Sequence, residues 1–253
     1  MAAPQTSDIL RAVIFTPFEY GGRTKAIVER LRNAVALDVF KDGDQLPPEP
    51  ELAAQLGVSP VTLRDALALL REAGLVETKR GRSGGSFVRR SAYEPVEHGR
   101  AQLRELSPVD LRDLSDWRIS VAAAAAALAA ERASDEEVEV LQAHVASFAE
   151  AADAAAARRA EGRLVIALAT ASQSLRHTRA AVESVVDYGP LLSVAYQSQD
   201  LRAHVARCHA TAGVAVHDGQ AVDAAKATRE AGLLVAIELA NCAAELSVEA
   251  RRE

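Results

Sequence analysis

The sequence predicts a mainly α-helical protein with two parts: an N-terminal winged helix-turn-helix domain (three helices and a β-hairpin wing) and a C-terminal all-α bundle. Three observations support this fold class. Alanine is abundant while aromatic residues make up 4% of the 253 residues, which favours helices over a sandwich or barrel. Residues 21–90 show the order helix, helix, turn, helix, hairpin. From residue 106 onward only helical patterns follow.

Apolar residues at helical spacing predict the first helix, from Arg23 to Val39. A glycine and three prolines in residues 41–50 end it. Residues 51–56 predict a short second helix, closed by Gly57. Ser59 is a good N-cap for the third helix, which is expected to run to about Ala73. Pro60 in its first turn costs no hydrogen bond.

Two short β-like runs, LVETK and GSFVRR, flank a glycine-rich tip and predict the hairpin. We expect an N-terminal arm over 1–20, the winged helix-turn-helix domain over 21–90, a linker over 91–105, and an all-helical domain over 106–253. Pro95 and Gly99 argue against regular structure in the linker. Helices are then expected at about 107–132, 134–158, 160–174, 178–198, 200–216 and 220–248.

Charge divides unevenly along the chain. Residues 21–90 hold twelve Lys/Arg and nine Asp/Glu, a balance of +3, whereas residues 91–253 hold sixteen and twenty-four, a balance of −8. The basic excess peaks from Lys79 to Arg90, where five basic residues occur without an acid. This asymmetry predicts that only the N-terminal domain meets a polyanion.

Several protein classes are not favoured. The longest apolar run, 121–130, is too short to span a bilayer, and the N-terminus does not resemble a signal peptide, so no membrane is expected and the protein is expected in the cytoplasm. Two cysteines do not make a disulfide framework. The glycine cluster at 81–85 leads into a strand, whereas a phosphate loop opens a helix. With no catalytic motif present, we expect no enzyme.

The third helix and the wing carry the candidate DNA contacts. The N-terminal turn of a helix in the major groove directs its N–H dipole to phosphate and its side chains to bases, and here it presents Ser59, Thr62 and Arg64. In the wing, glycines allow close approach to the backbone while arginines supply charge. The wing residues singled out are Arg80, Arg82, Gly84 and Gly85. The alternative is that these arginines are solvated surface residues.

The stretch LPPEPELAAQLGVSPVTLRDALALLREAGLVETKRGRSGGSFV resembles the winged-helix domain of the GntR family of bacterial transcription regulators. The later stretch LRDLSDWRISVAAAAAALAAERA resembles the start of the effector domain (FCD-like) of the FadR subgroup. The resemblance implies a homodimeric repressor that binds a short inverted repeat in double-stranded DNA and is released by a small-molecule effector, either a carboxylate or an acyl-type compound.

Two departures from the family pattern bear on DNA binding. Pro50 and Pro60 stand where relatives usually carry arginines that contact DNA. Both prolines fall at helix starts, so the fold should tolerate them, but proline supplies neither charge nor hydrogen bonds. We expect lower affinity or a different operator. The alternative function is a helical sensor or scaffold with a weakened DNA-binding head.

Many FadR-type relatives hold a divalent metal through one acid and three histidines. The resemblance places Glu161 at the acid and His209 at the second histidine. Val165 falls at the first histidine, and Ala231 or Gly232 at the third. Since valine, alanine and glycine have no ligating side chain, we expect no metal and no cofactor.

Three residues are the candidate effector contacts: Arg118, Glu161 and His209. Arg118 matches an arginine common early in this domain, where it would clamp a carboxylate. The alternatives are a helix-surface ion pair for Arg118 and a packed helix residue for His209.

Overall fold

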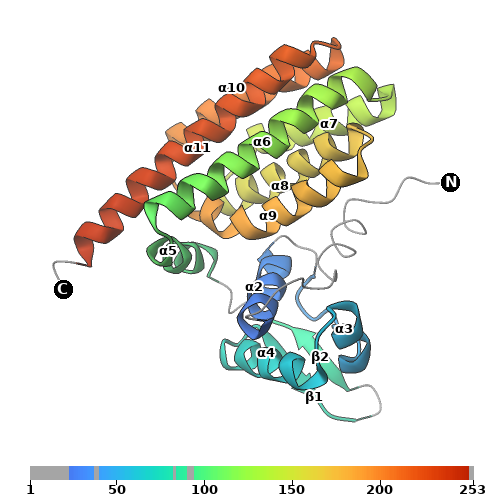
Figure 1. Cartoon of the computed structure of the whole chain (residues 1–253), viewed down its shortest axis with the longest axis vertical. Helices are drawn as coiled ribbons and strands as arrows, with labels where there is room; N and C mark the ends of the chain where they lie inside the picture. Colours follow the sequence, from blue (N-terminus) through green and yellow to red (C-terminus); the bar gives the residue numbers. More distant parts are fainter. Residues whose placement is uncertain (1–22, 37–39, 82–83, 90–93, 251–253) are drawn as a thin grey trace. The chain divides into compact units, whose positions relative to one another are not determined.

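The computed structural model describes residues 23–36, 40–81, 84–89 and 94–250 and is mainly helical, as the sequence predicts (Figure 1). The chain divides into two compact units between Glu94 and Pro95. The expected arm over 1–20 and the last three residues of the expected first helix, 37–39, lie outside the described residues.

The N-terminal unit contains three helices and one hairpin in the predicted order. The helices are α2 (Arg23–Ala36), α3 (Glu49–Gln55) and α4 (Pro60–Glu72), and the strands are β1 (Val76–Lys79) and β2 (Gly85–Val88). Helix α4 is the centre of this unit because α2, α3 and β1 all pack against it. Its inward stripe of buried side chains has helical spacing and consists of Leu63, Ala66, Leu67 and Leu70. Val61 and Leu69, two further apolar residues of α4, lie off this stripe and are exposed.

The wing is an antiparallel hairpin in which Val76 pairs with Val88 and Lys79 with Gly85. The loop between α2 and α3 runs along the other edge of β2. Leu46 N donates to Ser86 O at 2.8 Å, and Val88 N donates to Asp44 O at 2.9 Å. These bonds pair both edges of β2, so the wing is fixed to the body of the unit.

The C-terminal unit is a bundle of seven helices within the described residues: α5 (Pro95–Glu105), α6 (Pro108–Arg132), α7 (Asp135–Ala149), α8 (Ala154–Ala171), α9 (Leu175–Ala195), α10 (Gln199–His217) and α11 (Ala221–Glu249). Ser134 and Glu137 form the predicted capping box at the start of α7. The expected helix over 134–158 is wrong. The chain breaks after α7 because Asp153 caps a new helix, its side chain accepting from Ala156 N at 2.7 Å.

Helix α5 corrects the expectation of a linker over 91–105. Residues 95–105 are helical and pack against α9 in the bundle, and residues 91–93 lie outside the described residues. Gly99 allows α5 to pack closely against α9, since a Cβ at this position would lie 2.2 Å from the carbonyl oxygen of Pro190. Pro95 is the first helical residue, where proline is tolerated. Both residues that argued against a helix are therefore compatible with one.

Helix α11 closes the bundle and packs against α6 and α10. Gly232 brings α11 close to α6, since a Cβ there would meet Ile119 Cγ1 at 2.6 Å. By length and composition alone α11 could cross a membrane, with a mean hydropathy of 1.5 over its most apolar window. Only 28% of that window is buried inside the chain.

Candidate functional site

The N-terminus of α4 has the geometry expected of a recognition helix. Ser59 is the N-cap: its Oγ accepts from Thr62 N at 3.1 Å and lies 2.8 Å from Thr62 Oγ1. Pro60 is the first residue of the helix. The two hydroxyls thus hold each other in place, so the predicted polar pair at the helix tip is preorganised rather than free to rotate.

Arg64 is exposed on α4, one turn after Pro60, and is anchored by α3. Its Nε donates to Glu49 Oε2 at 3.0 Å, and 65% of the Arg64 side chain remains exposed. A guanidinium has five N–H donors, so others remain for a base edge or a phosphate. The sequence singled out Arg64 but not Glu49, because the two residues are fifteen positions apart and on different helices.

Val61 is a further candidate contact that sequence reasoning missed. Its side chain is 64% exposed and lies one helical turn before Arg64 and Asp65, which are also exposed. An exposed apolar side chain on this face can contact the methyl group of thymine in the major groove. The position of Val61 off the buried stripe of Leu63, Ala66, Leu67 and Leu70 was the signal that could have found it.

At the wing tip the backbone around Gly84 lies too close to neighbouring backbone for a residue with a side chain. A Cβ on Gly84 would lie 2.5 Å from the carbonyl oxygen of Lys79, so no other residue fits without a shift. Gly84 N donates to Gly81 O at 2.9 Å, and Gln45 Nε2 donates to Gly84 O at 3.1 Å. Gly85 begins β2, opposite Lys79. Arg80 is exposed directly after β1, while Arg82 lies outside the described residues.

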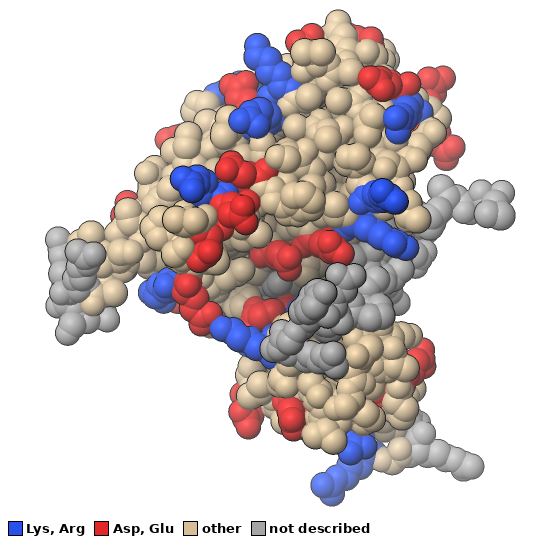
Figure 2. All heavy atoms as spheres, viewed as in Figure 1, with Lys and Arg blue, Asp and Glu red and all other residues tan. Residues whose placement is uncertain are grey.

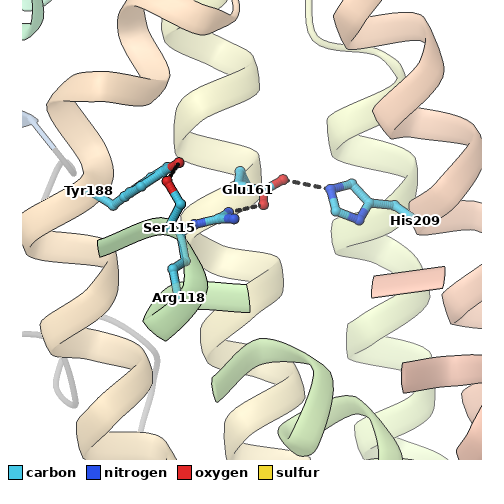
Figure 3. A network of polar contacts seen from close by, with 5 residues as sticks. All are labelled: Ser115, Arg118, Glu161, Tyr188 and His209. Atoms are coloured by element: carbon cyan, nitrogen blue, oxygen red, sulfur yellow. Dashed lines mark hydrogen bonds and ion pairs between the residues drawn. The ribbon is translucent and has the colours of Figure 1, made fainter. Parts of the chain in front are cut away.

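Inside the bundle, the three candidate effector residues come together from three helices (Figure 3). Arg118 on α6 donates from Nη2 to Glu161 Oε1, and His209 Nε2 on α10 lies 2.5 Å from the other oxygen, Glu161 Oε2. Glu161 is on α8, between the two. All three residues are buried, at 3–4% exposure. Arg118 is therefore not in a helix-surface ion pair, one of the two interpretations that its sequence left open.

Aromatic residues surround this ionic network. The guanidinium of Arg118 lies 5.0 Å from the ring centroid of Tyr188, and the Tyr188 hydroxyl is 2.9 Å from Ser115 Oγ. The ring of Phe148 meets His209 edge-on, at 4.8 Å between centroids. Sequence reasoning did not single out these aromatic residues, since each lies in an ordinary apolar helix pattern. They pack against the two ends of the network and contribute to its burial.

Glu161 is ionised in this environment. Burial alone raises the pKa of a carboxyl, but the positive charges of His209 and Arg118 and their hydrogen bonds outweigh it and lower the pKa of Glu161 to about 2. Because a carboxylate is acceptor-only, His209 must donate from Nε2. Burial and the nearby negative charge of Glu161 raise the pKa of Tyr196 well above its ordinary value, so its phenol is neutral.

These residues do not fit a transition-metal site. Glu161 and His209 supply two donors, and one oxygen of Glu161 already faces the positive charge of Arg118. Val165 and Ala231 are buried and have no ligating atom. Within the described ranges no group of three or more His, Cys, Asp or Glu side chains could hold a metal ion. That the protein binds no metal stays a prediction, to be checked by elemental analysis.

Comparison with known proteins assigns the N-terminal unit. Residues 23–88, from the start of α2 to the end of β2, match the family described as bacterial regulatory proteins, gntR family. This region is thus similar to the helix-turn-helix of the gntR family. The match includes α4 and the wing, so the surface built by Ser59, Thr62 and Arg64 lies within the gntR region.

Two relatives extend the similarity beyond this region. A protein named as the HTH-type transcriptional regulator RmpR, from Mycobacterium gastri, is 39% identical over 160 residues, covering 63% of this chain and 58% of RmpR. A protein named as an L-lactate dehydrogenase operon regulatory protein, from Escherichia coli, is 32% identical over 158 residues, covering 59% of this chain and 58% of the relative. The chain thus spans less than two thirds of either relative. Both are named as regulators rather than enzymes, in line with the sequence-based expectation.

A solved structure supports the fold of the whole chain. The E. coli protein McbR/YncC superimposes with a TM-score of 0.54 at 18% identity, over 88% of this chain and 99% of that one. A gntR-type winged helix followed by a helical C-terminal unit is therefore the fold of this chain, as the sequence predicts.

Proposed function

We propose that the chain is a DNA-binding transcription repressor that acts in the cytoplasm as a homodimer on a short inverted repeat. One observation carries this proposal: a capped helix tip with an exposed polar face lies within the gntR-family region. A single winged helix offers few contacts, whereas two-fold repetition adds the energies of both halves.

In this proposal the two parts of the surface have different tasks. Helix α4 enters the major groove, where Arg64 binds a guanine edge and Val61 contacts a neighbouring thymine methyl group. Arg80 and Arg82 in the wing bind phosphates, which position the protein but carry no sequence information. Because Glu49 is fixed on α3, its hydrogen bond to Arg64 limits the directions that the guanidinium can take.

The release signal in this proposal is a small organic carboxylate bound at the network in the bundle. The carboxylate of Glu161 lies between two donors, Arg118 and His209, and a ligand carboxylate would compete with it for Arg118. Such a ligand can shift the dimer between two arrangements only through different affinities for them. The E. coli relative is named for the operon of L-lactate dehydrogenase. The substrate of that enzyme is a hydroxy acid with a carboxylate, which is consistent with this ligand class.

Arg64→Ala tests the DNA-binding part. Removing one base contact of about 1–3 kcal/mol corresponds to roughly 5- to 150-fold in affinity per half-site, and the two half-sites add in a dimer. Binding is measured by fluorescence anisotropy on DNA from upstream of the gene itself, and on an unrelated duplex. The control is Arg207→Ala, an exposed arginine of α10. Unchanged affinity and specificity in Arg64→Ala would show that α4 is not the recognition helix.

A second candidate function is a helical sensor or scaffold whose DNA-binding head is weakened. Pro50, the second residue of α3, and Pro60, the first residue of α4, favour it, because they stand where the GntR resemblance expects arginines that contact DNA. The same titration separates the two functions. Wild-type protein that binds upstream DNA no better than an unrelated duplex supports the sensor, whereas selective and salt-dependent binding supports the repressor.

A further inference from the structure

A groove of about 650 Å³ runs along the outside of the bundle between α5, α6 and α11. Its walls are mostly apolar side chains, while Arg104, Arg112 and Asp116 bring charge to it. The main apolar lining residues are Leu103, Leu106, Leu111, Leu233, Ile237 and Ala240. An apolar centre with charged residues around it is the arrangement found in protein interfaces.

Helix α11 contributes a continuous apolar stripe to this groove. Leu233, Ile237, Ala240 and Ala244 follow one another at intervals of four, three and four residues, which is the spacing of a helix–helix seam. Ile237 is 60% exposed and Leu233 is 39% exposed. The surface along the C-terminal part of α11 shows few charges (Figure 2). A helix window with a mean hydropathy of 1.5 and only 28% burial is apolar enough for a core but is not covered by its own chain.

Side-chain size changes along the stripe and indicates what covers it. The bulky residues, Leu233 and Ile237, lie at its N-terminal end, and the small residues follow: Ala240, Ala244 and Ser247. A second α11 placed antiparallel by a two-fold axis would bring the bulky end of each helix onto the small end of the other. A parallel pair would set bulky against bulky and leave voids between the alanines, at the cost of packing.

We propose that this groove is the interface between two copies of the chain, built around an antiparallel pair of α11 helices. The stripe from Leu233 to Ser247 is about 22 Å long and only one helix wide. By itself it therefore covers less than the roughly 800 Å² per partner that a stable interface buries. The exposed or half-buried wall residues of α5 and α6 supply the additional surface, including Arg104, Leu106 and Pro108. The inference rests on the proposed function in that it locates the dimer contact of that repressor.

Ile237→Glu tests the interface. The side chain is exposed in the single chain, so glutamate there is tolerated by the monomer, but in the pair it would be buried without a partner. We expect the dimer dissociation constant, measured by sedimentation equilibrium, to rise at least a hundredfold. The matched control is Val140→Glu, since Val140 on α7 is 48% exposed and does not line the groove. Circular dichroism checks that both variants keep their helix content.

A cross-link provides a second, independent measurement. Ala240 lies midway between Leu233 and Ser247, near the expected two-fold axis. With Cys208 and Cys242 replaced by alanine, Ala240→Cys should form a disulfide-linked dimer under mild oxidation, because the two Cβ atoms would lie close together. Val140→Cys in the same background should stay monomeric on a non-reducing gel.

The outcomes separate this inference from the proposed function. A dimer that survives Ile237→Glu, or wild-type chain that is monomeric at tens of micromolar, overturns the interface. A monomeric wild type whose groove binds an apolar fluorescent dye, with binding abolished in Ile237→Glu, shows an amphiphile site instead and also overturns it. If Ile237→Glu leaves the dimer intact and wild-type protein binds its upstream DNA selectively as a dimer, the interface fails while the proposed function stands. A monomeric wild type overturns both the interface and the homodimer of the proposed function.

Discussion

The two units each contain an arginine–glutamate pair that joins two helices, and the two pairs differ mainly in their exposure to water. In the N-terminal unit, Arg64 on α4 and Glu49 on α3 keep 65% and 39% of their side chains exposed. In the bundle, Arg118 on α6 and Glu161 on α8 keep 4% each. The same two residue types therefore occur once at a surface and once inside a core.

This difference in exposure determines what each pair can do. Exposed ion pairs contribute about 0–1 kcal/mol, so Arg64 can leave Glu49 at little cost, as the proposed contact with a DNA base requires. Breaking a buried pair costs about 3–5 kcal/mol, because one charge is left without compensation. The pair in the bundle thus holds α6 and α8 together.

The largest expected effect comes from removing the buried partner. Glu161→Ala leaves Arg118 buried without a counter-charge and should lower the free energy of unfolding by about 3–5 kcal/mol. Glu49→Ala, its counterpart at the surface, should lower it by less than about 1 kcal/mol. Urea unfolding monitored by circular dichroism measures both. Equal decreases in the two variants would show that burial does not distinguish the pairs.

A pH titration should sharpen the same comparison. Because the pKa of Glu161 is lowered to about 2 in the folded protein, its ionised form contributes stability that is complete above its ordinary pKa of 4.5 and is lost as the pH falls toward 2. Glu161→Gln cannot ionise, so the stability gap between wild type and this variant should be constant near neutral pH and shrink below about pH 4.5. Thermal melts from pH 7 to pH 3 measure the gap. A gap that stays constant down to pH 3 would contradict the buried ion pair.

The smallest effect is expected at the wing. Arg80→Ala should weaken binding to all DNA sequences alike and reduce the slope of log affinity against log salt by about one unit, because one phosphate fewer is neutralised by the protein. Arg64→Ala, in contrast, should reduce discrimination between sequences. Anisotropy titrations at several salt concentrations separate the two. Reduced discrimination in Arg80→Ala would mean that the wing reads bases.

Local signals in the sequence predicted the elements of the N-terminal unit because the residues that start and stop them act over a few positions. Ser59 caps α4, and Pro60 occupies its first turn, as expected. Contacts between distant residues could not be predicted in this way. The pairing of Glu49 with Arg64 and the fit of Gly99 against Pro190 both depend on how helices pack, which no local pattern records.

The bundle shows the same limit. A family resemblance, rather than any pattern of periodicity, singled out Arg118, Glu161 and His209, which the structure brings together. The break at 150–153 was missed because alanines on both sides continue the helical pattern. The exposed stripe of α11 was missed because its composition is that of an ordinary core helix. Sequence periodicity does not show whether the apolar face of a helix packs against its own chain or against a second chain.

The contact between Gly99 and Pro190 also determines where the chain can be cut. Helix α5 lies in the same compact unit as the bundle, and its Leu103 is 2% exposed within the main core. A fragment that begins at residue 106 would lack Leu103 and expose the face of α9 that Gly99 covers. A fragment that begins at Pro95 keeps both. Dissecting this protein into separately expressed halves, or swapping its DNA-binding half for that of another regulator, should therefore use a junction before Pro95.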